Sequence, residues 1–188
     1  MIATHQGKAQ TKLQQLTLSS PAFIEGEDLP RIYTADGSDL SPPLHWDGIP
    51  NGTTSFVLFF EDLDVAQNSW VHWLLFDIPA EANGLPAGLP SIPYLANGAR
   101  HGLCWGVGEY SQLGYQGPAL SSPQFRQKPD HQDSRHRLCF SLIALDTRLA
   151  LPVGSSPHRV RTEMDGHQLS TASLTCLYGY RTQSSSRH

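Results

Sequence analysis

Two apolar runs separated by a short acidic turn constrain this chain more than any other feature. The first run, Ser55–Phe60, is followed by Asp62 and Asp64, and the second run spans Trp70–Ile78. Both runs are short and rich in Val, Phe and Trp, which is typical of buried strands and not of helices. The pattern predicts two buried strands whose polar residues lie where the strands end and begin.

Further short strands and frequent turns extend this pattern to most of the chain. The sequence contains 16 glycines and 14 prolines, which favour turns. One helix is expected to begin near Pro157, capped by Ser155 or Ser156, and to end near Gly166. The fold class predicted is mainly β, an antiparallel β-sandwich with one or two short helices near the C-terminus. The other expected strands are Leu16–Leu18, Leu29–Tyr33, Leu44–Trp46 and His136–Leu145, and Leu169–Tyr180 is expected to form a strand or a short helix.

Composition and charge exclude several classes of function. The formal net charge is −4 and there is no Lys/Arg run, so binding of nucleic acid is not expected. No apolar stretch approaches the ~20 residues that a membrane-spanning helix needs. The N-terminus lacks a signal-peptide core, so a cytoplasmic protein is expected. We predict a flexible arm at 1–15, one domain at 16–180 and a flexible tail at 181–188.

The first candidate site residues are Asp62 and His72. Strict alternation along the second strand would place His72 on the face of Leu74 and Phe76, opposite Trp73. A carboxylate beside an imidazole fixes its tautomer and can raise its pKa. Alternatively, these residues have no function in binding: the acidic residues form a solvated turn, and His72 is a hydrogen-bonded residue of the core.

A second histidine and a glycine-rich segment strengthen the prediction of a binding site. His136 begins another strong apolar strand, and the segment Gly114–Pro118 precedes it. Glycines there can expose backbone N–H groups to an anion, and Tyr115 can add a wall or a hydroxyl donor. These residues predict a small anion pocket for a phosphate-like group, although Gly114–Pro118 could equally form an ordinary turn.

Four segments together resemble the phosphatidylethanolamine-binding protein family, in particular its bacterial and archaeal branch that is similar to Raf kinase inhibitors. The resemblance covers roughly Leu16 to Tyr180. It rests on Ser41–Trp46, on Phe60–Ala66 with its two aspartates, on Trp70–Pro79, and on Gly114–Pro118 followed by His136-Arg137.

The resemblance implies a large antiparallel sheet packed on a smaller one, with an anion-binding pocket at one end. Its partners would be a phosphate or phospholipid headgroup and a kinase or protease, with a homodimer as a further expectation. It implies no catalytic turnover, no cofactor and no metal. Carried over residue by residue, the ligand-binding set is Asp62, His72, Tyr115, Gly117, Pro118 and His136.

The chain departs from the family pattern at several positions around the expected pocket. Leu63, Val65 and Ala66 replace residues of the family's Asp-Pro-Asp-Ala-Pro turn, which makes the turn less rigid. Leu138 stands where the family has a tyrosine, which removes a hydroxyl donor. The segment Ala119–Arg135 has about ten extra residues by this resemblance and could form a lid. These differences concern the identity of the ligand.

Two enzymatic hypotheses compete with binding. Two histidines and one carboxylate on a β-scaffold are also the ligands of a non-haem iron or zinc site. A hydrolase would need a nucleophile, and the chain has no Gly-x-Ser-x-Gly motif. Of the three cysteines, Cys104 alone has loop-like surroundings, while Cys139 and Cys176 lie in strand-like runs. The cysteines form no paired framework and are expected to be buried, reduced thiols.

Overall fold

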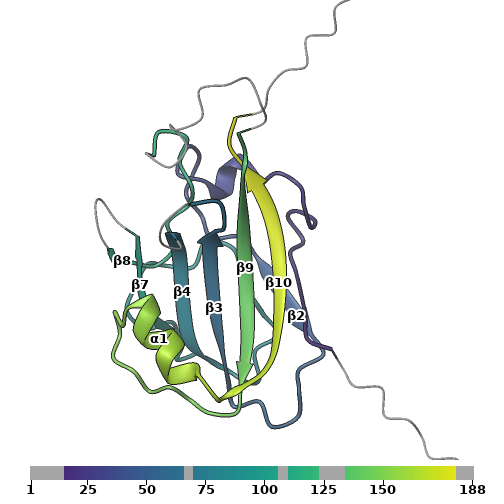
Figure 1. Ribbon diagram of the computed structural model, residues 1–188, viewed down its shortest axis with the longest axis vertical. Helices are drawn as coiled ribbons and strands as arrows, with labels where there is room; N and C mark the ends of the chain where they lie inside the picture. Colours follow the sequence, from purple (N-terminus) through teal and green to yellow (C-terminus); the bar gives the residue numbers. More distant parts are fainter. Residues whose placement is uncertain (1–14, 66–69, 106–109, 123–133, 181–188) are drawn as a thin grey trace, which may run out of the picture.

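The chain is built around one five-stranded antiparallel sheet. The computed structural model describes residues 15–65, 70–105, 110–122 and 134–180. The strand order is β10-β9-β3-β4-β6, and every neighbouring pair in it is antiparallel (Figure 1). Its strands are β3 (Ser55–Asp62), β4 (Trp70–Pro79), β6 (Arg100–His101), β9 (His136–Leu145) and β10 (Gln168–Tyr178).

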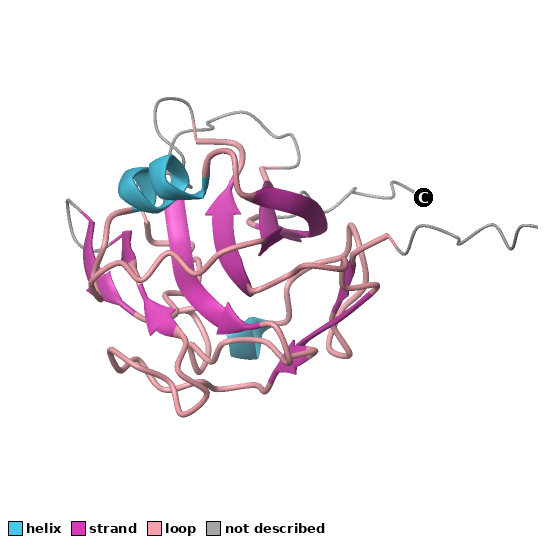
Figure 2. Cartoon of the chain, turned by 90° about the horizontal axis from the view of Figure 1, so that it is seen from below, coloured by secondary structure: helices cyan, strands magenta, loops and turns pink. Residues whose placement is uncertain are grey.

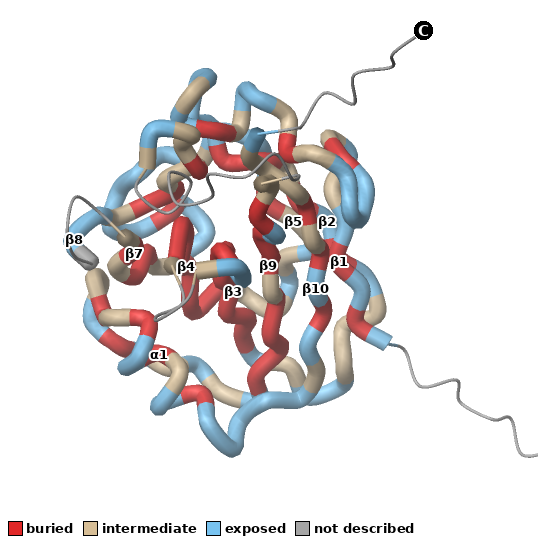
Figure 3. Tube along the Cα trace, turned by 45° about the horizontal axis from the view of Figure 1, so that its top comes forward, coloured by how far each residue is buried: buried red, intermediate tan, exposed pale blue. Residues whose placement is uncertain are grey.

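The two strands that flank the acidic turn form the middle of this sheet. All eight residues of β3 are buried, as are all residues of β4 except its two ends (Figure 3). Such continuous burial requires cover on both faces of the sheet, and it explains why these runs lack a polar alternation. Two separate apolar clusters provide the cover, one on each face.

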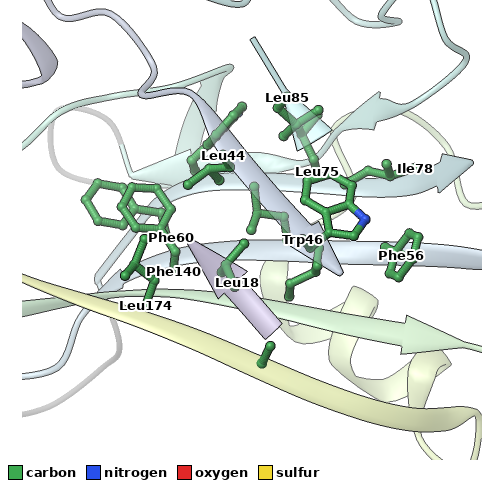
Figure 4. Packing of buried hydrophobic residues seen from close by; sticks show 14 of the residues in the cluster. Leu18, Leu44, Trp46, Phe56, Phe60, Leu75, Ile78, Leu85, Phe140 and Leu174 are labelled. Carbon is green, nitrogen blue, oxygen red and sulfur yellow. The ribbon is translucent and has the colours of Figure 1, made fainter. Parts of the chain in front are cut away.

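A small three-stranded sheet covers the first face. It consists of β1 (Thr17–Ser19), β2 (Leu44–Asp47) and β5 (Gly84–Leu85), in the order β1-β2-β5. Trp46 of β2 is 1% exposed, and its ring lies 5.6 Å from that of Phe56 (Figure 4). The rings of Phe60 and Phe140 stack with their centroids 3.9 Å apart at the other end of the same cluster. This face therefore has the predicted packing of a large sheet on a smaller one.

The helix α1 (Pro157–Met164) covers the second face, on the side opposite the small sheet (Figure 2). Ser156 caps it by accepting a hydrogen bond from the N–H of Arg159 at 3.3 Å, as the sequence predicted. Arg161 donates to the carboxylate of Glu61 at 2.6 Å, and its guanidinium lies 4.3 Å from the centre of the Phe59 ring. The helix is thus held to the sheet by packing and by one ion pair.

The expected strand at Leu29–Tyr33 is wrong. Residues Arg31–Tyr33 form a short 3-10 helix, η1, and only Leu29 bonds to a strand, donating its N–H to Leu177 at 2.8 Å. Pro30 has φ −58° and begins the helical turn, which the alternation of side chains did not reveal. The glycine-rich segment after β6 forms a third, two-stranded sheet from β7 (Leu103–Trp105) and β8 (Tyr110–Leu113).

The outer edge of β10 is partly covered. The N–H of Gly26 donates to Thr175, the N–H of Leu177 donates to Glu27, and a carboxylate oxygen of Glu25 accepts from the N–H of Thr175 at 2.7 Å. Residues 25–29 therefore close the C-terminal part of this edge strand. Among the described residues, no helix is long and apolar enough to cross a membrane.

Candidate functional site

A buried carboxylate and a buried histidine meet at one end of the large sheet. Asp62 is the last residue of β3 and lies opposite Leu138 of β9, so His136 lies diagonally across from it on the same face. Nδ1 of His136 is 2.7 Å from Oδ2 of Asp62, and the two side chains are 6% and 0% exposed. This end of the sheet is at the top of Figure 1, where β3 and β10 end and β4 and β9 begin.

The turn after Asp62 is fixed by its own acidic residues. The other carboxylate oxygen of Asp62, Oδ1, accepts a hydrogen bond from the N–H of Asp64 at 2.9 Å. Asp64 in turn accepts from the N–H of Arg137 and from its guanidinium, both at 2.8 Å. This guanidinium lowers the pKa of the Asp64 carboxyl. Both oxygens of Asp62 are therefore used within the protein, and its position does not depend on a rigid proline turn.

His72 lies on the face opposite to the one that alternation predicts. Phe60 pairs with Trp73 and Glu61 pairs with Val71, so His72 is an extra residue in β4, a β-bulge. Its ring lies 5.3 Å from that of Phe60, on the side of Trp73, whereas Leu74 packs in the cluster under α1. The bulge turns His72 toward the face that carries Asp62 and His136.

His72 is held by its neighbours in the glycine-rich segment. Its Nδ1 is 2.8 Å from the carbonyl oxygen of Gln116, and its own carbonyl accepts from the N–H of Gln116 at 2.9 Å. Burial lowers the pKa of His72 to about 4; the charge of Asp62 acts in the opposite direction, and that of His136 lowers the pKa further. The three side chains therefore share one electrostatic neighbourhood, in which His72 is neutral at pH 7.

The nitrogen Nε2 of His72 has no hydrogen-bond partner among the described residues and makes essentially no contact with solvent. Two other buried nitrogens share this property, Nε1 of Trp73 and Nε2 of His101. This nitrogen of His72 is thus closed off from solvent by the protein.

Two backbone amides of the segment Gly114–Pro118 are not the free donors that the sequence predicted. The N–H of Gly117 donates to Oδ1 of Asp39 at 2.7 Å, and that of Gln116 is used by His72. Pro118 is buried, and its carbonyl accepts from the N–H of Ala35 at 3.0 Å. The segment instead positions His72. Asp39 and Gln116 were not recognised from the sequence, because their role depends on a contact between two distant loops.

Tyr115 contributes an aromatic wall and no free hydroxyl group. Its ring stacks on Phe60 with the centroids 5.7 Å apart and meets Trp73 edge-on at 5.5 Å. Its hydroxyl group donates to the carbonyl of Tyr33, the last residue of η1, at 2.5 Å. Burial raises the pKa of this hydroxyl group well above its usual value. Tyr115 therefore supports the site from behind Phe60.

The structure also bears on the two enzymatic hypotheses. The described ranges contain no group of three His, Cys, Asp or Glu residues arranged to hold a metal ion. Cys104 lies in strand β7 and not in a loop, and its thiol donates to the carbonyl of Gly114 at 3.1 Å. Burial raises the pKa of this thiol to about 12, which disfavours a thiolate nucleophile. All three cysteines are buried and free, as predicted.

Several predicted segments lie wholly or mostly outside the described residues. The greater part of the expected lid, Ala119–Arg135, lies outside the described residues, as do the predicted N-terminal arm up to residue 14 and the tail at 181–188. Leu138, at the position where the family pattern has a tyrosine, is fully buried and pairs with Asp62 across the strands.

Comparison with known proteins identifies the family. The family described as "Phosphatidylethanolamine-binding protein" matches residues 19–179. The UPF0098 protein of Methanothermobacter thermautotrophicus is 36% identical over 163 residues, covering 87% of this chain and 98% of the relative. The UPF0098 protein of Aquifex aeolicus is 34% identical over 160 residues, covering 85% of each chain.

Solved structures agree with this result. A putative phosphatidylethanolamine-binding protein homologue from Chlamydia trachomatis superposes with a TM-score of 0.72 at 29% identity, covering 89% of this chain and 99% of that one. YbcL of Escherichia coli, described as a new member of the mammalian family, gives a TM-score of 0.71 at 25% identity, with the same coverage. The chain belongs to the phosphatidylethanolamine-binding protein family.

Proposed function

We propose that this protein binds a small oxyanion, a phosphate or a phosphoryl group, at the sheet end that contains Asp62, His72 and His136. The buried pair of Asp62 and His136 is the observation that carries the proposal. Both oxygens of Asp62 take part in hydrogen bonds within the protein, so this carboxylate is fixed beside His136. An imidazole that a carboxylate orients is a good partner for an oxyanion.

Membership in a family of binding proteins supports this proposal, and the family's name refers to a phospholipid with a phosphoryl headgroup. Among the residues that the structure describes, the site has aromatic walls from Phe60 and Tyr115, which exclude water and strengthen interactions with charge. Modulation of a kinase or protease and formation of a homodimer stay predictions of the resemblance.

Titration of the protein with phosphate and phosphoethanolamine, followed by NMR of the histidine side chains, tests the proposal. We expect the signals of His72 and His136 to shift together and to saturate. Replacing His136 by Ala should weaken binding by about tenfold or more, because a charge-assisted hydrogen bond contributes about 1.5–3 kcal/mol. Circular dichroism shows whether the variant is folded.

The chain offers a matched control. His167 also pairs with an aspartate, Asp146, at 2.8 Å, but both residues are exposed and lie near the opposite end of the sheet, where α1 leads into β10. His167→Ala should leave binding unchanged. If His136→Ala does not fold, Asp62→Asn keeps the shape of the pair and should also weaken binding. Unchanged anion affinity in the folded variants contradicts the assigned site.

A further inference from the structure

The edge strand β10 turns some of its main-chain groups away from the sheet. It is the last strand of the large sheet and pairs with β9 on one side only (Figure 1). The N–H of Thr175 points to the outer side, where the carboxylate of Glu25 accepts it at 2.7 Å. The pairing with β9 is regular over Ser170–Tyr178, so the same alternation turns the main-chain groups of Thr171 and Ser173 outward.

The outward groups of Thr171 and Ser173 are open to an added strand. Both residues are exposed, and no main-chain hydrogen bond from elsewhere in the described chain reaches them. Edge strands usually carry charged residues or prolines, or are covered, which prevents pairing with other chains. The strand Gln168–Tyr178 contains no charged residue and no proline. Residues 25–29 cover only its C-terminal half.

We propose that this open edge pairs with the same edge of a second copy of the chain. The two β10 strands run antiparallel about a two-fold axis through Ala172. Thr171 of each copy then lies opposite Ser173 of the other, and each such pair exchanges two main-chain hydrogen bonds. Because both copies use the same surface, the pairing closes at a dimer and does not continue into a filament.

Both ends of the open segment fit a second copy. In this register Leu169 of one copy reaches the position opposite Thr175 of the other, where Glu25 already binds. The register of β10 shifts between Gln168 and Ser170, and such a bulge bends the strand. Each strand therefore bends where the cover of the other copy begins. A straight strand of another protein would meet this cover.

The pairing leaves the candidate anion site free. That site lies at the end of the sheet where β10 ends, and the second copy runs in the opposite direction (Figure 1). The two sites of the dimer therefore lie at opposite ends of one continuous sheet. The inference does not depend on the function proposed above.

Sedimentation equilibrium of the full chain, at concentrations from about 10 μM to 1 mM, measures the association. We expect a monomer–dimer equilibrium with a Kd between about 1 μM and 1 mM, because such a short interface is of the weak, transient kind. A chain that stays monomeric at 1 mM overturns the proposal.

Two variants and one control locate the interface. Ser173→Pro removes an outward N–H that β9 does not use, and it should weaken the dimer at least about tenfold. Thr171→Lys places two like charges on diagonal neighbours, about 7–8 Å apart, and should also weaken it if the proline variant does not fold. Ser173→Thr keeps the N–H and should change the Kd by less than about threefold. A dimer of unchanged affinity in the folded Pro or Lys variant overturns the proposal.

A cross-link tests the register. Ala172 of the two copies forms a pair without mutual hydrogen bonds, with the Cα atoms about 4.5 Å apart, which suits a disulfide. Mild oxidation of Ala172→Cys should therefore link two chains. The natural chain is the control, because its three cysteines are buried and should not cross-link. If the variant sediments as a dimer but forms no disulfide, the proposed two-fold axis is wrong.

Discussion

At the scale of single residues, burial determines the protonation state of His72 and the hydrogen bonds that its ring can form. Its Nδ1 is committed to Gln116, its Nε2 has no partner in the described chain, and its pKa is lowered to about 4. A histidine that stays neutral in the folded state makes folding sensitive to pH, because the unfolded chain binds a proton that the folded chain does not.

We therefore expect the ligand-free protein to lose stability as the pH falls from 6.5 toward 4. The pKa of His72 has the ordinary histidine value of 6.5 in the unfolded chain and is about 4 in the folded protein, so its contribution is complete above pH 6.5 and declines below it. Between pH 8 and pH 5 this loss is about 2 kcal/mol. Urea unfolding at both pH values measures it.

Comparison with His72→Gln isolates this effect, because His101 also has a pKa lowered by burial and acts in the same direction. The variant should lose less stability over the same pH interval. Equal losses in the two proteins would mean that His72 is protonated in the folded state.

At the scale of elements, the site depends on one bulge and on one loop contact. The bulge in β4 places His72 and Trp73 on one face, and the segment Gly114–Pro118 holds His72 there. Gly114 has φ +88°, and a Cβ added to it would lie 2.2 Å from Oγ of Ser91 and 2.7 Å from its Cα. Glycine is thus required there for two reasons, conformation and space.

Gly98 provides the matched control for this position. It has the same φ of +88°, but a Cβ there meets nothing within 4 Å. Gly98→Ala should cost about 1 kcal/mol from backbone conformation alone. Gly114→Ala should cost roughly 1–3 kcal/mol more, because of the overlap with Ser91, and should weaken anion binding. Thermal unfolding and the phosphate titration measure the two effects; equal costs for both variants would contradict the close packing.

The elements differ in how well the sequence predicts them. The apolar runs specify β3, β4 and β9 because burial on both faces leaves a strong compositional signal. The pairing of Asp62 with His136 also requires β3 and β9 to be neighbours in the sheet, which the sequence did not show. The bulge at His72 could not be predicted, since it adds one residue to β4 without any Gly or Pro. The contact between Asp39 and Gly117 was also hidden, because it joins loops that are far apart in sequence.

At the scale of the whole molecule, β3 lies between the two apolar clusters that cover the two faces of the large sheet. Phe60 packs with the small sheet and lies 5.3 Å from His72, whereas Phe59 packs under α1 against Arg161. Adjacent residues of one strand thus face two different layers, and the candidate site lies on the side of Phe60.

Phe60→Leu and Phe59→Leu test this division. Both side chains are at most 1% exposed, so each variant should lose roughly 1–3 kcal/mol in the free energy of unfolding. Only Phe60→Leu should also reduce phosphate affinity, because it removes a wall beside His72. Chemical denaturation and the same NMR titration distinguish the two; a similar loss of affinity in Phe59→Leu would argue against separate layers.

The cover that residues 25–29 place along β10 has a consequence for handling the protein. Deleting the chain through Leu29 would leave the main-chain groups of Thr175 and Leu177 unsaturated at the border of the sheet. Such a border recruits strands from other molecules. The same deletion removes β1 and the buried Leu18, Phe23 and Leu29, so a shortened version of this protein would lose core packing and would also tend to form fibrils or precipitate.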